Sequence, residues 1–305
     1  MTESHSTTGT DINPLLDPVF QQLKSQGKEK FFASLYLMEI DWETTPLTVL
    51  GKLIEYEAVH KMESLEDLKV RLREDRKIFA FFHPEAPHEP LIFVQLAFTK
   101  GMADNIQRLL DVDRSPLSIR KADTLTFYSI SNAQAELTGI NFGHFLIQRV
   151  VAEIAEHYSH IKHFATLSPI PGFGAWLTDW LDQGDVAVMF DTQRALLADA
   201  LQTNWQEDEA TIEQIKPLLM RLCAHYLLHE KQAGKPLDPV ANFHLFNGAM
   251  IAQIHWLADS SDKGMRQSLG MMVNYHYKPP KMDQYQADFL QSGKVVASKV
   301  IEDYL

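Results

Sequence analysis

A serine in a turn rich in proline and glycine is the first residue of this sequence that could do chemistry. Ser168 lies in the run Leu-Ser-Pro-Ile-Pro-Gly-Phe at 167–173, directly after a stretch that predicts a strand. Proline restricts the backbone, so the hydroxyl would be held on a rigid support. The same composition is also typical of a strand-to-helix turn in which a serine bonds only to the backbone. The residues alone leave both interpretations open.

A histidine among apolar residues is the second candidate. His244 stands between Phe243 and Leu245 in a segment that predicts a helix. Its imidazole could act as a general acid or base, or it could be a hydrogen-bonded core side chain. There are 13 histidines but no His-Glu-x-x-His pattern, and a single cysteine, Cys223, so we expect no metal ion.

Glycines between a predicted strand and a predicted helix form a third candidate segment. Gly139 and Gly143 flank the end of a loop at 132–142, after a strand predicted at 123–131. Backbone N–H groups beside glycine, together with the N-terminal end of a helix, can bind a pyrophosphate. Glycine is equally common there as a turn or cap residue.

Net charge and missing motifs exclude several classes of protein. The formal net charge is −12 at pH 7, which argues against binding to nucleic acid or to an anionic membrane surface. No stretch approaches the roughly 20 apolar residues of a membrane span, and Met1–Asn13 lacks the apolar core of a signal peptide. Gly-x-Ser-x-Gly, Walker and Gly-x-Gly-x-x-Gly patterns are absent. By elimination we expect a cytoplasmic location.

The elements that must position these residues follow from the spacing of apolar side chains. Ser64 and Asp67 resemble a capping box at the start of one predicted helix. Helical periodicity predicts helices at 14–40, 46–61, 64–75, 143–158, 173–183, 189–203, 210–230 and 239–258, and at the C-terminal end. Aromatic and β-branched residues predict strands at 77–83, 89–99, 123–131, 163–167 and 270–277, the first two as a hairpin.

The order of these elements predicts the fold class. Strand, strand, strand, glycine loop, helix and strand follow one another as in an acyl-CoA-binding domain of the acetyltransferase (GNAT) type. We therefore predict an α/β (α+β) fold: a mixed sheet flanked by helices, with a short helical N-terminal lead-in and helical C-terminal additions. The expected domain boundaries are a disordered tail at 1–13, the helical lead-in at 14–40 and one large domain at 41–305.

Over residues 40–280 the sequence resembles the malonyl-CoA decarboxylase family. The resemblance is carried by Phe-Tyr-Ser-Ile-Ser at 127–131, Gly-His-Phe-Leu-Ile-Gln-Arg-Val-Val at 143–151, the serine run at 167–173, Asn-Phe-His-Leu at 242–245 and Asn-Tyr-His-Tyr at 274–277. It implies an acetyltransferase-like catalytic domain that converts malonyl-CoA to acetyl-CoA and carbon dioxide. No cofactor is implied, because the thioester carbonyl itself accepts the electrons.

The resemblance also implies roles for individual residues. Ser168 and His244 would be catalytic, with His244, oriented by Ser168, protonating Cα, and Ser129 and Tyr277 would lie near the substrate. Asn141 stands at a substrate-contacting position where the family usually carries an acidic residue, which leaves open whether a carboxylate contributes there. The implied coenzyme-binding residues are Gly139, Ile140, Phe142, Gly143 and His144.

Two further expectations concern assembly and alternative activities. Residues 1–40 are too few for the helical domain with which the family assembles, so we do not expect the family's tetramer, although another homo-oligomer stays open. An acyl-CoA-dependent N-acetyltransferase and a non-catalytic acyl-CoA sensor are the alternatives to a decarboxylase. The same scaffold can support all three functions.

Overall fold

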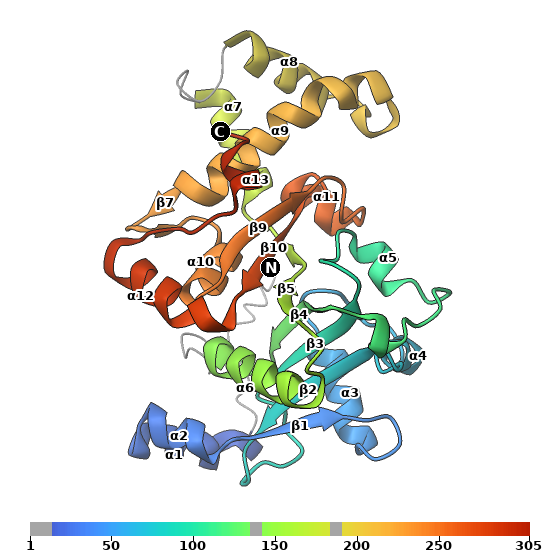
Figure 1. Ribbon diagram of the computed structural model, residues 1–305, viewed down its shortest axis with the longest axis vertical. Coiled ribbons are helices and arrows are strands. Elements are labelled where there is room, and N and C mark those ends of the chain that lie inside the picture. The colour runs from blue at the N-terminus through green and yellow to red at the C-terminus, as the bar shows by residue number, and fades with distance from the viewer. Residues whose placement is uncertain (1–13, 135–141, 184–190) are drawn as a thin grey trace, which may run out of the picture. The chain divides into compact units, whose positions relative to one another are not determined.

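The computed structural model describes residues 14–134, 142–183 and 191–305 (Figure 1). The chain forms two compact units, each of which is built from several chain segments. The first unit comprises the residues up to Leu72, Lys77–Gln95 and Ile130–Val150, and the second comprises Arg73–Arg76, Leu96–Ser129 and Val151–Leu305. Strands β3 (Ile92–Thr99) and β4 (Thr124–Asn132) each contribute residues to both units.

The first unit packs short helices against the start of the sheet. Its elements are α1 (Asp17–Gln26), α2 (Lys28–Ser34), β1 (Tyr36–Ile40), α3 (Leu47–Tyr56), α4 (Leu65–Val70) and, except for its first residue, β2 (Arg76–Phe82). The predicted cap of α4 is confirmed, since Ser64 Oγ accepts a hydrogen bond from the Asp67 N–H at 3.1 Å. The apolar core of this unit includes Ile40, Leu50, Leu53, Phe82 and Phe93.

Residues 36–40 form a strand, although the sequence placed them in a helical lead-in. β1 pairs antiparallel with β2, with Tyr36 opposite Phe82 and Ile40 opposite Ile78. Three apolar residues at 35, 37 and 38 suit a helix and a strand about equally well. Hydrogen bonds to β2 decide between them, because tertiary pairing outweighs propensities of a few tenths of a kcal/mol per residue.

The second unit holds the remaining strands. β4 pairs in parallel with β5 (His163–Thr166), and β5 pairs antiparallel with β10 (Met272–Tyr277). β10 also pairs antiparallel with β6 (Ser168–Pro169) and β9 (Met250–His255). The hydrogen-bonded order is β1-β2-β3-β4-β5-β10-β6, with β9 beside β10. The predicted mixed sheet with accompanying helices is therefore confirmed.

Most helices belong wholly to the second unit, and α6 (Phe142–His157) belongs to both. The others are α5 (Ile106–Leu110), α7 (Phe173–Gln183), α8 (Asp191–Leu201), α9 (Glu209–His229), α10 (Pro239–Phe246), α11 (Asp262–Ser268), α12 (Met282–Ser292) and α13 (Lys299–Glu302). α9, α10 and α13 each contact β9 (Figure 1).

The helix predicted at 239–258 is wrong beyond Phe246, where α10 ends and the chain turns into β9. Gly248 has φ 80°, and a Cβ at this position would lie 2.4 Å from the carbonyl oxygen of Met282. The Asn247-Gly248 pair is a turn signal that helical periodicity hid. Residues 250–255 then find hydrogen-bond partners on β10, which a sequence pattern does not show.

Candidate active site

Ser168 begins the short strand β6 and is buried at 5% exposure. It lies opposite Val273 of β10, and Pro169 lies opposite Met272. Its hydroxyl does not bond merely to the backbone of a turn. Ser168 Oγ is 3.1 Å from His244 Nε2 and donates to Thr166 Oγ1 at 2.9 Å. The serine is therefore part of a side-chain network.

His244 lies in the last turn of α10, where its imidazole bridges two other side chains. Its Nε2 contacts Ser168 Oγ, and its Nδ1 is 2.7 Å from Tyr277 Oη. The ring also stacks on Tyr275, with centroids 4.5 Å apart. Ser168, His244 and Tyr277 are far apart in the sequence, yet they form one continuous, buried, hydrogen-bonded chain.

Asp238 ties the two elements that carry the serine and the histidine. Its Oδ1 caps α10 by accepting from the N–H groups of Val240 and Ala241 at 3.0 and 2.9 Å. Its Oδ2 accepts from the Gly172 N–H at 3.2 Å, in the turn that follows Ser168. Asp238 is not among the residues that the sequence predicted for the site. The available signal was an aspartate directly before the proline that starts a helix.

Burial controls the protonation of His244 and Tyr277. Burial lowers the pKa of His244 from 6.5 to about 3 and raises the pKa of Tyr277 well above its ordinary value. Both side chains are therefore neutral near pH 7 while the site is empty. An anion brought beside His244 would raise the pKa of the imidazole again, since an opposite charge favours the protonated form. The arrangement suits a histidine that gains a proton when an acidic ligand binds.

The depressed pKa of His244 predicts a loss of stability in acid. An unfolded chain protonates this histidine near pH 6.5, whereas the folded protein keeps it neutral down to about pH 3. The unfolded state thus binds more protons between these values. The contribution of His244 to the free energy of unfolding is therefore fully present above pH 6.5 and decreases as the pH is lowered from there. The slope is at most roughly 1.4 kcal/mol per pH unit.

Urea unfolding of the wild type and of His244→Gln between about pH 7 and pH 5 measures this loss. We expect the variant to lose less stability over this range. His276, whose pKa burial lowers to about 4, contributes equally to both proteins. Equal slopes for the two proteins would contradict the prediction.

The other predicted site residues fall into two groups. Ser129 is buried on β4, in the same unit as Ser168. Phe127 of β4 lies opposite Thr166 of β5, so Ser129, two residues further, projects from the same sheet face as Phe127. Phe142, Gly143 and His144 begin α6. The predictions for Gly139, Ile140 and Asn141 lie outside the described residues.

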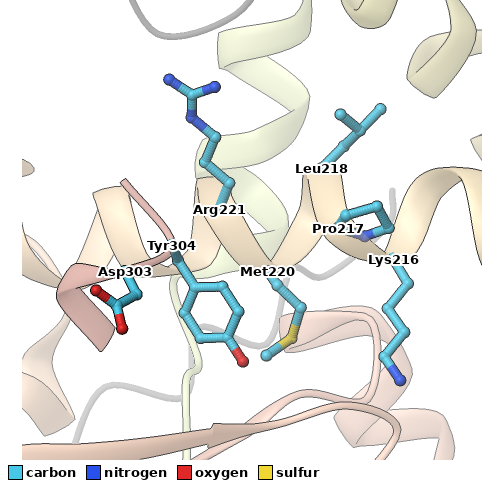
Figure 2. A pocket seen from close by; sticks show the side chains of 7 residues that line it. All are labelled: Lys216, Pro217, Leu218, Met220, Arg221, Asp303 and Tyr304. Carbon is cyan, nitrogen blue, oxygen red and sulfur yellow. The ribbon is translucent and has the colours of Figure 1, made fainter. Parts of the chain in front are cut away.

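A surface cavity of about 500 Å³ lies apart from these residues, in the second unit. It is formed by one face of α9 and by the residues that follow α13 (Figure 2). Met220 and Tyr304 point toward each other across it, whereas Arg221 extends away from Tyr304 (Figure 2). None of the residues named for chemistry lines this cavity.

Neither a metal cluster nor a membrane span is found in the part of the chain that the structure describes. Within 14–134, 142–183 and 191–305, no three His, Cys, Asp or Glu side chains are grouped so that they could hold a metal ion. No helix in these ranges is long and apolar enough to cross a membrane.

The fold and the site together define an α/β protein with a buried serine–histidine pair suited to proton transfer. The family described as "Malonyl-CoA decarboxylase C-terminal domain" matches residues 33–305. The chain belongs to this family, which confirms the resemblance carried by the serine and histidine segments.

Curated relatives and solved structures agree with this assignment. Mitochondrial malonyl-CoA decarboxylase of Rattus norvegicus is 36% identical over 301 residues, which are 92% of this chain and 61% of that protein. The Anser anser anser enzyme is 36% identical over 93% of this chain and 60% of its own length. The chain thus spans about three fifths of the length of these curated relatives.

The solved structures of two bacterial malonyl-CoA decarboxylases share the fold. The Rhodopseudomonas palustris structure has a TM-score of 0.83 at 39% identity and covers 94% of this chain and 73% of its own. The Agrobacterium vitis structure has a TM-score of 0.85 at 40% identity, covering 89% of this chain and 67% of its own.

Proposed function

We propose that this protein decarboxylates malonyl-CoA, releasing carbon dioxide and leaving acetyl-CoA. Membership of the family supports the choice of substrate. The single observation that carries the chemistry is the buried contact between Ser168 Oγ and His244 Nε2, extended to Tyr277. These are the side chains that the sequence nominated for catalysis and for the substrate pocket.

The proposed reaction needs an acid and a stabilised anion. The bond between Cα and the carboxylate carbon breaks, carbon dioxide leaves, and the electron pair stays on Cα. The thioester carbonyl delocalises this pair as an enolate, and one proton, replaced from water, restores the methyl group. Because the thioester is the electron sink, no cofactor is needed for the electrons.

His244 is the proposed source of that proton. The malonyl carboxylate, placed beside the imidazole, would raise the pKa of His244 from its depressed value, so that the imidazole picks up a proton as the substrate binds. Tyr277 holds Nδ1, so Nε2–H faces Ser168 and the substrate. Delivery of a proton by a positioned histidine is typically worth roughly 10²–10⁴-fold in rate.

Stabilisation of the enolate oxygen is assigned to backbone N–H groups. That backbone N–H groups near Ser129 and at 139–143 hold the thioester stays a prediction of the sequence. One such donor contributes roughly 3 to 4 kcal/mol to catalysis in other enzymes.

A cytoplasmic location and a homo-oligomer also stay predictions of the sequence.

Carbon dioxide release from malonyl-CoA by the purified protein, with a chelator present, tests the proposal. Acetyl-CoA should appear in equal amount. An acetylated product that forms from acetyl-CoA only when an amine is added would instead indicate a transferase. Thermal stabilisation by coenzyme A esters without carbon dioxide release would indicate a sensor.

Ser168→Ala should lower kcat for carbon dioxide release by roughly 10- to 100-fold, because His244 loses the group that orients its Nε2. The matched control is Ser292→Ala, an exposed serine whose hydroxyl donates only to the Asp288 carbonyl of its own helix. Steady-state kinetics of the two variants measure the difference. Undiminished turnover in Ser168→Ala would remove this serine from the mechanism.

A further inference from the structure

The ladder between β10 and its neighbour is interrupted directly before Ser168. β5 and β6 pair with β10 in one continuous antiparallel register, since Ala165 lies opposite His276 and Ser168 opposite Val273. Thr166, the last residue of β5, therefore lies opposite Tyr275, and Leu167, in the gap between β5 and β6, lies opposite Asn274. The sheet continues through this gap, but side chains replace its backbone hydrogen bonds.

Thr166 is the residue that makes this replacement. The Tyr275 N–H donates to Thr166 Oγ1 at 3.0 Å instead of to a backbone carbonyl. The Thr166 carbonyl accepts from Asn274 Nδ2 at 2.6 Å, and the same amide nitrogen donates to the Ala103 carbonyl at 2.9 Å. Asn274 is in turn held by His255 Nε2 at its Oδ1. Thr166 is thus fixed at its hydroxyl and at its carbonyl.

This fixed hydroxyl also decides where the proton of Ser168 points. Ser168 Oγ donates to Thr166 Oγ1, and a serine hydroxyl has only one hydrogen. Ser168 Oγ must therefore accept, not donate, in its contact with His244 Nε2. The imidazole then carries its hydrogen on Nε2, and Nδ1 accepts from Tyr277 Oη. In this order the Tyr277 hydroxyl, the His244 Nε2–H and the Ser168 hydroxyl each meet an acceptor.

We infer that Thr166 is a positioning residue. By accepting a hydrogen bond from the Ser168 hydroxyl, it selects the His244 tautomer that carries its hydrogen on Nε2. Thr166 does not touch the reacting atoms. It acts through Ser168, which it leaves with a lone pair for His244. The catalytic consequence rests on the proposed function, because the Ser168 lone pair directed at Nε2 also accepts from the Nε2–H of the protonated imidazole that would face the substrate.

The tautomer can be measured without any turnover. Nitrogen NMR of ¹⁵N-histidine-labelled protein at neutral pH distinguishes the two imidazole tautomers, and His244→Gln assigns the resonances by removing them. We expect the wild type and Thr166→Ser to show hydrogen on Nε2. In Thr166→Val the Ser168 hydroxyl loses its acceptor and can turn toward His244, so the ratio of Nδ1–H to Nε2–H should rise roughly tenfold, in line with the loss of one hydrogen bond.

The variants form a matched pair, because serine keeps the hydroxyl and valine keeps the shape. A wild type with hydrogen on Nδ1, or a ratio unchanged in Thr166→Val, would overturn the inference. The wild-type spectrum decides even if Thr166→Val does not fold.

For kinetics, we expect Thr166→Val to lower kcat for carbon dioxide release roughly tenfold with little change in KM, and Thr166→Ser to restore it. Absence of carbon dioxide release by the wild type would refute the proposed function and leave the tautomer result standing.

Discussion

His244→Gln should lower kcat for carbon dioxide release from malonyl-CoA by roughly 10²–10⁴-fold, the range lost when a positioned proton donor is removed. Glutamine is close to histidine in size and can still bond Ser168 Oγ and Tyr277 Oη, so the pocket should keep its shape. Its amide, however, cannot be protonated near neutral pH. The loss should therefore fall on kcat, with KM changed little.

The control for this variant is another histidine that hydrogen-bonds a neighbouring side chain. His225 on α9 contacts Glu230 and takes no part in the proposed chemistry, so His225→Gln should turn over like the wild type. Stopped-flow or coupled assays at saturating malonyl-CoA give kcat for both variants. If folded His244→Gln kept more than about a tenth of wild-type turnover, His244 could not be the proton donor.

Asp238→Ala should lower the free energy of unfolding by about 2 to 4 kcal/mol and reduce activity as well. Alanine leaves the Val240 and Ala241 N–H groups of α10 without their cap, and it leaves the Gly172 N–H without its acceptor. Because these groups belong to the two elements that carry His244 and Ser168, the contact between these two side chains, which we propose to be catalytic, should loosen. Urea unfolding measures the stability.

Two further variants separate the effect of capping α10 from the effect of tying α10 to the turn that follows Ser168. Asp208 caps α9 at an exposed site by accepting from the Ala210 N–H, so Asp208→Ala should cost much less stability and no activity. Asp238→Asn can keep an oxygen for the helix cap while it turns its amide nitrogen toward the Gly172 N–H, and it should fall between wild type and Asp238→Ala. If Asp238→Ala were no more destabilised than Asp208→Ala, the role of Asp238 in tying together the two elements that carry Ser168 and His244 would be disproved.

Local pattern was sufficient for several features of this protein. The strands β2 and β3, which are rich in aromatic and β-branched residues, and the Ser64 cap of α4 were all predicted correctly. The cap depends on residues that are neighbours in the chain, and the two strands consist of residue types that favour an extended backbone. The serine run around Ser168 was also recognisable, because proline and glycine restrict a backbone in a way that the sequence displays directly.

Tertiary structure alone decided what those residues do. β9 follows Gly248 because β10 offers it partners, and β1 is a strand because β2 does. The same holds for the site: His244 carries a pKa of about 3 only because distant segments bury it. The direction of the Ser168 proton depends on Thr166, whose hydroxyl is held by a strand more than a hundred residues later. Burial and hydrogen-bond direction are properties of neighbours in space, and the order of residues along a chain does not contain them in readable form.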